Sequence, residues 1–362
     1  MNRDPSLNND GLLESLCATI TTLESPAFAQ YRGLEPLANR HFVRALLRDR
    51  LLTHEVQRGG ALTADLRALN DLALREAALE TRRNVTLVRI IEALSAAGVP
   101  SLVFKGSALA HSLYPKPELR ERDDTDLAVI HSHLQVADRV LGRLDFKAIA
   151  GNEGSLIMRQ RLYRHRDADG LLHNIDLHWA ISNSPRTNQL NVRDLLARSR
   201  ELAALGTHAR MPSVTDNFLI ACAHLDAHHV HDVRLVWLYD LHLMIAQMPV
   251  GIRAHASRQA IEYELGGACA WVLTLLEQTL GTSLIGFEAL LANADARRPG
   301  ASRVSQWQRE LRALPDNRTR TRWLWQHMFP APRFVRDSQH PNTSLWRLYL
   351  ARLLRGAAHL SR

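Results

Sequence analysis

The chain has 362 residues, of which 46% are hydrophobic and 23% charged, as is typical of a globular protein with two or three domains. No apolar run approaches the length of a membrane span and the polar N-terminus has no signal pattern, so we expect a cytoplasmic protein without a membrane partner. The net charge of +8 permits an anionic partner, but the cations are interleaved with Asp and Glu, which disfavours nucleic-acid binding.

Two rare residue types are informative. Only three residues are lysines, Lys105, Lys116 and Lys147, and the other cations are arginines. A lysine directly before a Gly-Ser step therefore suggests a compact charge near a phosphate. The three cysteines, Cys17, Cys222 and Cys269, are sparse and far apart in the sequence, which argues against a disulfide framework.

The first part of the chain, to about residue 98, has apolar residues at helical spacing. We expect one helix over 35–57, "EPLANRHFVRALLRDRLLTHEVQ", ended by the Gly59-Gly60 step. A second, long helix follows, with Thr63 as its N-cap and Gly98 as its C-terminal stop.

From residue 99 the pattern changes to short strands and helices. We expect a strand in "VPSLVFKG", a helix in "SALAHSLY", a strand in "DTDLAVI" and a helix begun by a capping box of Ser132 and Gln135. A hairpin follows over 155–181, with its turn at Asp169-Gly170. After about residue 190 the chain is predicted to be helical again.

Alternation along two of these strands brings carboxylates to one face of a sheet. On the first strand Asp124 and Asp126 point the same way, and on the second hairpin strand Asp176 and His178 share a face. If the two strands are neighbours, three carboxylates meet at one place. Such a group suits divalent cations, and hard oxygen ligands favour Mg²⁺.

The Gly-Ser step supplies a site for phosphate. It follows a strand and opens a helix, so free backbone N–H groups and the positive end of the helix dipole would face phosphate oxygens. Gly106 would let the phosphates approach the backbone closely, and Ser107 would offer a hydroxyl donor.

The order of "KGSAL", "RERDDTDLAV" and "NIDLHWAIS" resembles the nucleotidyltransferase superfamily of the DNA polymerase β type. More closely, it resembles the bacterial group called uncharacterised nucleotidyltransferases, with a "KG.AL…R…D.DLLV…DLHW" pattern. The resemblance implies an α+β fold with a small mixed-sheet nucleotidyltransferase core over 85–188. This core would lie between an N-terminal helical region, 1–84, and a C-terminal helical domain, 189–362.

The resemblance also implies roles for the motif residues. Asp124, Asp126 and Asp176 become the catalytic and metal-binding carboxylates, holding two Mg²⁺ ions, with Mn²⁺ as the alternative. Gly106 and Ser107 become the phosphate-binding turn. Independently of the resemblance, Lys105 is a candidate phosphate-binding residue, and Arg120 and Arg122 are candidates to neutralise the charge of a bound triphosphate, with exposed Arg–Asp pairing on a loop as the alternative. The chain departs from the superfamily pattern in having Lys-Gly-Ser instead of Gly-Gly-Ser and a longer gap between Ser107 and Asp124, which weakens transfer of detailed substrate chemistry.

Histidines form a second group of candidates. His178 and His224 are candidate acceptor-side residues. His224 and His228 lie four residues apart on one helical face in "HLDAHHVHD", next to His229 and His231, which is the spacing of a metal pair. No third ligand is evident in the sequence, so we interpret this segment as a polar helix face that lines the cleft.

These observations predict a nucleotidyltransferase that binds an NTP, with ATP expected, and transfers the nucleoside monophosphate to an acceptor with release of pyrophosphate. A small-molecule acceptor is favoured. Two alternatives remain open: a nucleotide-binding or regulatory protein without turnover, and a transferase acting on a protein or an RNA end. The sequence does not specify the acceptor or the oligomeric state.

Overall fold

The computed structural model describes residues 10–21, 28–57, 63–149, 156–230, 232–293, 303–330, 332 and 344–351. The helices are α1 Asp10–Thr21, α2 Phe28–Arg40, α3 Arg44–Gln57, α4 Ala64–Ala96, α5 Lys105–Leu113, α6 Leu134–Arg143, α7 Val192–Ala197, α8 Val214–His228, α9 Leu235–Gln247, α10 Val250–Glu262, α11 Gly266–Leu280, α12 Glu288–Ala292, α13 Arg303–Arg312 and α14 Asn317–Met328. The strands are β1 Ser101–Phe104, β2 Thr125–Val129, β3 Lys147–Ala148, β4 Gln160–Arg166, β5 Leu172–His178, β6 Arg200–Glu201 and β7 Arg210–Met211. Residues 345–351 are also helical.

Five strands form one mixed sheet in the order β1-β2-β5-β4-β3. The strands β2 and β5 run parallel, whereas the pairs β1–β2, β4–β5 and β3–β4 are antiparallel. The short strands β6 and β7 form a separate two-stranded sheet. The fold is therefore α+β with a mixed sheet, as predicted.

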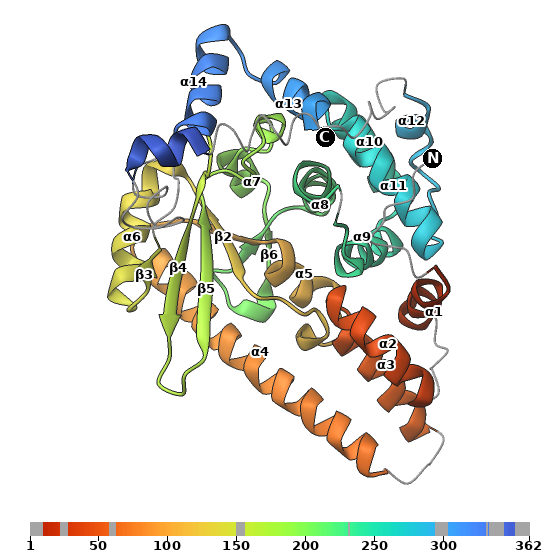
Figure 1. Cartoon of the computed structure of the whole chain (residues 1–362). Coiled ribbons are helices and arrows are strands. Elements are labelled where there is room, and N and C mark those ends of the chain that lie inside the picture. Colours follow the sequence, from red (N-terminus) through yellow and green to blue (C-terminus); the bar gives the residue numbers. More distant parts are fainter. Residues whose placement is uncertain are drawn as a thin grey trace.

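One face of the large sheet is apolar. Leu127, Ile175 and Leu177 point to this face and pack with residues of α4 and α6, such as Ile90 and Val140. In Figure 1, α4 crosses behind the strands and α6 flanks them, while α8 and α9 lie on the other side. Burial of this face anchors the sheet on the long helix.

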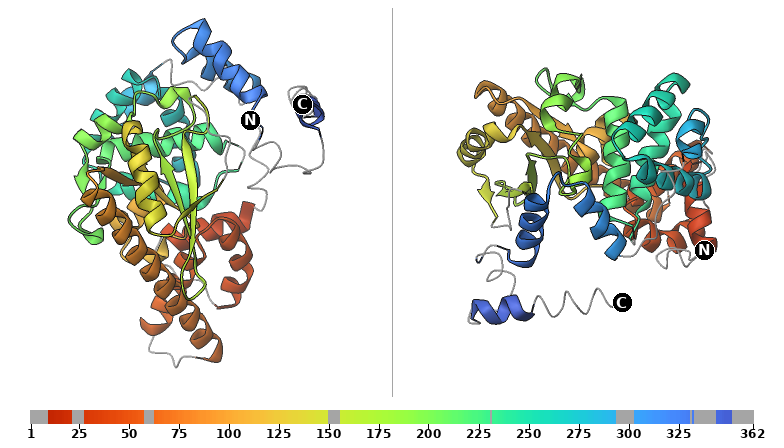
Figure 2. Two further views of the ribbon diagram at one scale, coloured as in Figure 1. Left: turned by 90° about the vertical axis from the view of Figure 1, so that its left-hand side faces the viewer. Right: turned by 90° about the horizontal axis from the view of Figure 1, so that it is seen from above.

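A second core joins the helical parts that flank the sheet. Side chains of α1, α3, α8, α9 and α11 share one buried cluster, to which the sheet contributes Leu102, Phe104 and Ala128 from its other face. A small cluster of Ile157, Leu314 and Trp323 lies apart from it. Figure 2 shows α13 and α14, in blue, at the outside of the molecule.

Several predicted local features are confirmed. The Thr63 hydroxyl accepts a hydrogen bond from the Leu66 N–H at the start of α4, and Gly98 adopts a φ of 71° just beyond the end of this helix. The hairpin β4–β5 turns through Asp167–Gly170, with Gly170 at a φ of 85°. Such positive φ values favour glycine.

Two predictions of local structure are wrong, and one pair of strands was not predicted. The expected helix over 35–57 is two helices, α2 and α3, because the chain turns at 41–43, where Phe42 has a φ of 58°. Ser132 lies inside a 3-10 turn, His131–His133, so α6 begins without a side-chain cap and there is no capping box. The strands β6 and β7 were not predicted. Each is only two residues long, which is too short to show the alternation of apolar and polar residues that identifies a strand.

The Gly59-Gly60 step lies outside the described residues, and the division of the chain at residues 84 and 188 remains a prediction. Among the helices of the described residues, none combines the length and the apolar character needed to cross a membrane.

Candidate active site

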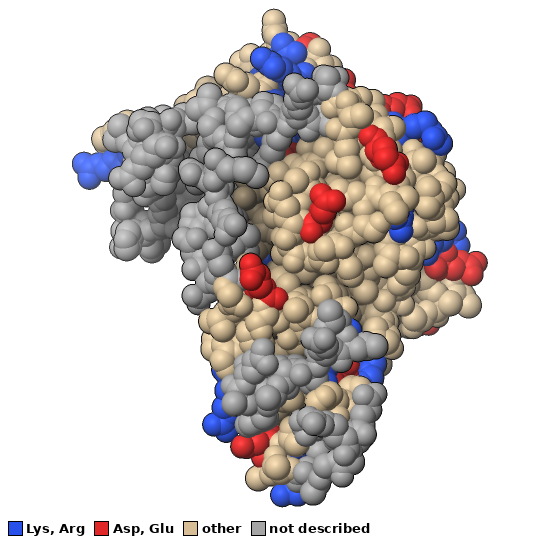
Figure 3. All heavy atoms as spheres, turned by 90° about the vertical axis from the view of Figure 1, so that its right-hand side faces the viewer, with Lys and Arg blue, Asp and Glu red and all other residues tan. Residues whose placement is uncertain are grey.

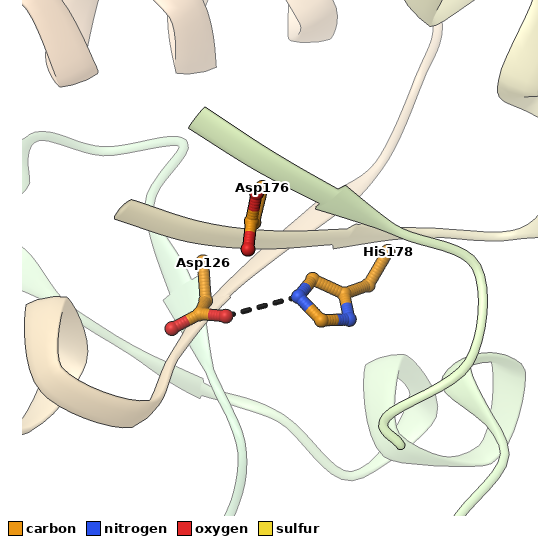
Figure 4. A group of neighbouring side chains, drawn as sticks. All are labelled: Asp126, Asp176 and His178. Carbon is orange, nitrogen blue, oxygen red and sulfur yellow. Dashed lines mark hydrogen bonds and ion pairs between the residues drawn. The ribbon is translucent and has the colours of Figure 1, made fainter. Parts of the chain in front are cut away.

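The parallel pairing of β2 with β5 places Asp126 directly opposite Asp176 in register. His178 follows two residues later on the same face of β5, because side chains alternate along a strand. Figure 4 shows the two carboxylates and the imidazole turned toward one another. One ligand atom from each of these three residues lies within 4.8 Å of the other two, so that this group could hold a metal ion.

Asp126 is the carboxylate of this group that forms an ion pair with a lysine. Its Oδ1 lies 2.8 Å from Nζ of Lys105 and 2.9 Å from Nε2 of His178, and its side chain is buried. Burial alone would raise the pKa of Asp126, but the Lys105 ammonium and the His178 hydrogen bond outweigh it and hold this pKa well below its ordinary value. Nδ1 of His178 is buried and has no hydrogen-bond partner among the residues that the structure describes.

Asp124 lies just outside the strand, since β2 begins at Thr125. Its side chain is solvent-exposed, but neighbouring protein displaces part of its water, and the charges of Asp126 and Asp176 lie close to it. Displacement of water and then these two charges raise the pKa of Asp124 to about 6. Asp124 thus lies beside the pair formed by Asp126 and Asp176. The group that could hold a metal ion consists of Asp126, Asp176 and His178 and does not include Asp124.

Asp176 is partly buried, and Nε2 of Gln160 donates to its Oδ2 over 3.1 Å. Burial and the negative charge of Asp126 raise the pKa of Asp176. Its carboxylate therefore retains more basicity than that of Asp126.

The Lys-Gly-Ser step forms the first turn of α5, immediately after β1. Lys105 has a φ of 50°, a strained conformation for a residue with a side chain. A Cβ on Gly106 would lie 2.8 Å from Nη1 of Arg120, so the absent side chain makes room for this guanidinium. The Ser107 hydroxyl is buried and accepts a hydrogen bond from Arg122 over 3.1 Å.

Two arginines next to the carboxylates have buried acidic partners. Nη2 of Arg122 lies 2.9 Å from Oε1 of Glu80 on α4, and its Nη1 donates to the Ser107 and Thr125 hydroxyls. Arg120 forms an ion pair with Asp240 of α9, with its Nη2 2.7 Å from Oδ2. Arg122 therefore connects the start of β2 with the long helix α4 through its contacts with Thr125 and Glu80. Its role in nucleotide binding remains a prediction.

A cavity of about 260 Å³ opens beside the carboxylates. Asp124, Asp126, Lys105 and Gly106 line one side of it. The opposite wall comes from α8, α9, the connection between them and the turn at 41–43, whose lining residues include Phe42, His224, His229, Arg234 and Trp237. The strands and the flanking helices thus border a common space.

The histidines on α8 are close neighbours of one another. The ring centroids of His224 and His228 are 5.5 Å apart, and Nε2 of His228 lies 3.1 Å from the Ser182 hydroxyl. Burial, followed by the charge of Lys105, lowers the pKa of His228 to about 4 and that of His224 well below its ordinary value. These imidazoles are therefore neutral at neutral pH; His231 lies outside the described residues.

The sequence did not point to Phe42, Arg234, Trp237 or Asp240 as part of this space. The segment "RLVWLYDL" is predicted to be helical and also resembles the family, but no local pattern in it indicates a cavity wall. Arg120 was considered as a triphosphate ligand, but its pairing with Asp240, 120 residues later in the chain, had no sequence signal.

The α+β fold, with acidic residues on adjacent parallel strands beside a strand-turn-helix step, is the arrangement expected from the sequence resemblance to nucleotidyltransferases. The model of the family described as "Uncharacterised nucleotidyltransferase" matches residues 31–281, more than half of the chain, so the chain belongs to this family and is a transferase.

Two further comparisons add little. The chain is similar to the solution structure of the antibiotic-resistance factor ANT(2'')-Ia, with 16% identity and a TM-score of 0.36 over 50% of this chain and 95% of that one. This likeness is too weak to inform function. A search of curated proteins finds no match.

Proposed function

We propose that this nucleotidyltransferase transfers a nucleoside monophosphate from an NTP, with ATP expected, to a hydroxyl of an acceptor and releases pyrophosphate. The observation that carries the proposal is the register pairing of Asp126 with Asp176 on adjacent parallel strands, next to the first turn of α5 and at the edge of a cavity. Carboxylates gathered at one place, beside a turn with backbone donors, suit a substrate made of phosphate and divalent cation.

The residues present fit a divalent metal ion. Asp126 and Asp176 offer oxygen ligands and His178 a nitrogen ligand within the same small space. Oxygen ligands suit Mg²⁺, and an imidazole in the set is compatible with Mn²⁺. We propose that two ions would be held by Asp124, Asp126 and Asp176, with Asp124 contributing from just outside the strand. When bound, such ions would neutralise phosphate charge and stabilise the attacking and leaving oxygens.

The protein's own groups would position the reactants and move one proton. Asp176, whose pKa is raised by burial and by Asp126, is proposed to accept the proton of the acceptor hydroxyl. The hydroxyl oxygen then forms a bond to the α-phosphorus while the bond from this phosphorus to pyrophosphate breaks. Lys105 is proposed to exchange its contact with Asp126 for the phosphates, and the turn at Gly106 to support them.

A small-molecule acceptor is favoured over a nucleic acid. The cavity lies between the sheet and the helices, and its helical wall carries aromatic rings and neutral imidazoles. On the face drawn in Figure 3, the basic side chains of the described residues form no continuous stripe of the kind that nucleic-acid backbones require.

The proposal is tested by pyrophosphate release from each of the four NTPs, with Mg²⁺ or Mn²⁺ and a panel of small hydroxyl-bearing acceptors. Asp126→Asn is expected to reduce release by about a thousandfold or more, because a central charge of the site is lost. Asp71→Asn, at an exposed position of α4, is the matched control and should behave like the wild type.

Circular dichroism would verify that Asp126→Asn is folded. Binding of Mg-ATP without pyrophosphate release under any condition would support the alternative of a nucleotide-binding protein. Equal release by Asp126→Asn and the wild type would contradict the proposed site.

A further inference from the structure

Charge pairing within the cavity singles out one cation. Four basic side chains line the cavity, and three of them have carboxylate partners: Lys105 with Asp126, Arg120 with Asp240, and Arg122 with Glu80. The fourth, Arg234, has no carboxylate partner among the described residues. Its guanidinium instead lies over two aromatic rings, with Cζ 4.3 Å from the ring centroid of Phe42 and 5.2 Å from that of Trp237.

Two distant segments hold this arrangement in place. Arg234 directly precedes α9, and Phe42 lies in the turn between α2 and α3, where its φ of 58° is unusual for an aromatic residue. The turn is attached to α9, because the Leu235 and Val236 N–H groups donate to Nδ1 and the carbonyl oxygen of His41. These N–H groups are already used, so the helix end itself offers few donors, and the free charge is that of the Arg234 side chain.

Arg234 forms no ion pair within the part of the chain that the structure describes; Asp232, two residues earlier, is near His229 but is not paired with Arg234. A cation–π contact attracts a cation to a ring but adds no negative charge. The nearby His229 is neutral at neutral pH, since burial and the Arg234 charge lower its pKa to about 4. The cavity therefore has carboxylates at the sheet and, at the helices, one guanidinium that forms no ion pair with any described residue. A ligand that fills it would place cations near the carboxylates and an anion near the guanidinium.

We propose that Arg234, held between Phe42 and Trp237, is an oxyanion-binding subsite of this cavity that takes a phosphate or carboxylate group of a substrate. Guanidinium groups pair with both kinds of anion, often through two parallel hydrogen bonds. The inference rests on the proposed function, because it assigns a ligand group to the far wall of the same site. The anion comes either from the triphosphate of the nucleotide or from an acidic group on the acceptor.

Isothermal titration calorimetry at low salt distinguishes the two sources. Magnesium tripolyphosphate is the probe for the nucleotide's phosphates. 3-Phosphoglycerate, added after the site has been filled with a non-hydrolysable ATP analogue, is the probe for an acidic acceptor. Arg234→Gln is expected to weaken binding of one of these probes about tenfold or more, as for loss of a charged hydrogen-bond partner. A loss for tripolyphosphate assigns the subsite to the nucleotide, and a loss for 3-phosphoglycerate assigns it to the acceptor.

Two variants serve as controls. Arg193→Gln removes the same charge from an exposed position on α7 and should leave both affinities unchanged. Arg234→Lys keeps the charge but loses the planar fork, so its affinity should lie between those of the wild type and Arg234→Gln. Thermal unfolding would establish that the Arg234 variants are folded.

Two results would overturn the subsite: no binding of either probe to the wild-type protein, or binding by Arg234→Gln equal to that of the wild type. Neither measurement requires turnover. If Arg234→Gln binds both probes normally while Asp126→Asn abolishes pyrophosphate release, the subsite fails and the proposed function stands. If tripolyphosphate binding depends on Arg234 but the wild type releases no pyrophosphate, the proposed function fails and the subsite stands.

Discussion

The two faces of the five-stranded sheet use the same strands for different purposes. On the face toward α4 and α6, Leu127, Ile175 and Leu177 are buried in an apolar core. On the opposite face, their immediate neighbours Asp126 and Asp176 form a pair of carboxylates beside a cavity. Alternation along the strand therefore allows a rigid core to position charges that would otherwise repel one another.

The two arginines before β2, Arg120 and Arg122, pair with acidic residues on different helices. Arg122 reaches Glu80 on α4, whereas Arg120 reaches Asp240 on α9, and both arginines also line the cavity. Residues two apart in sequence thus connect the sheet to different parts of the molecule. The comparison leads us to expect that changes on the α4 side reduce stability first, and that changes on the cavity side reduce function first.

The largest effect on stability is expected from Leu177→Ala. Leu177 is fully buried in the apolar core, and its truncation should lower the free energy of unfolding by about 2–5 kcal/mol. Leu172→Ala on the same strand, where the side chain is 37% exposed, is the control and should change it by about 0.5 kcal/mol or less. Chemical denaturation measures both. Equal effects of the two substitutions would contradict the division between the faces.

A loss of about 3 kcal/mol is expected from Arg122→Met, because it leaves the buried Glu80 without its main partner. The double variant with Glu80→Leu should recover most of this loss, since no charge then remains buried. Denaturation of the single and double variants tests this expectation. If Arg122→Met is instead as stable as the wild type but binds Mg-ATP more weakly, Arg122 acts in nucleotide binding, as the sequence motif predicts.

A smaller loss, about 1–3 kcal/mol, is expected from Gly106→Ala. The new methyl group would lie 2.8 Å from Nη1 of Arg120, which is buried and held by Asp240 and therefore cannot move freely. Gly142→Ala on the exposed side of α6 has nothing within 4 Å of the added methyl and should be neutral or slightly stabilising. Thermal unfolding of the two variants would test the close packing; a neutral Gly106→Ala would contradict it.

The smallest effect concerns the pH dependence of stability without metal. Because the pKa of Asp124 is raised to about 6, the native state binds more protons than the unfolded state between about pH 4 and 6. Its contribution therefore destabilises the fold as the pH rises through this window. Between pH 4.5 and 7, the wild type should lose about 1 kcal/mol more than Asp124→Asn, since solvent screens this exposed carboxyl. Denaturation in EDTA measures this difference, and identical pH profiles would contradict the raised pKa.

Part of the candidate site followed from the sequence. The same-face relation of Asp176 and His178 could be predicted from alternation alone. Their meeting with Asp126 needed only the further assumption that the two strands are neighbours, and the structure confirms this pairing. Asp124 was expected inside the strand, but β2 begins one residue later. A shift of one residue at a strand end cannot be resolved by a pattern of period two.

Contacts between distant segments could not be predicted in this way. Cys222 and Cys269, far apart in the sequence, are neighbouring buried thiols on α8 and α11. The placement of Arg234 over Phe42 likewise depends on how α9 docks against the turn at 41–43. Neither segment contains a sequence motif that predicts its contact with the other.

The amino-acid sequence by itself determined the features that depend on neighbours in the chain: the Thr63 cap, the Gly170 turn and the alternation that sends Asp126 and Leu127 to opposite faces. These follow from backbone geometry and from hydrogen bonds over a few residues. Only the tertiary structure decided which partner each buried charge has and which wall closes the cavity. Those choices depend on the packing of whole helices and strands, for which residues far apart in the chain carry no local signal.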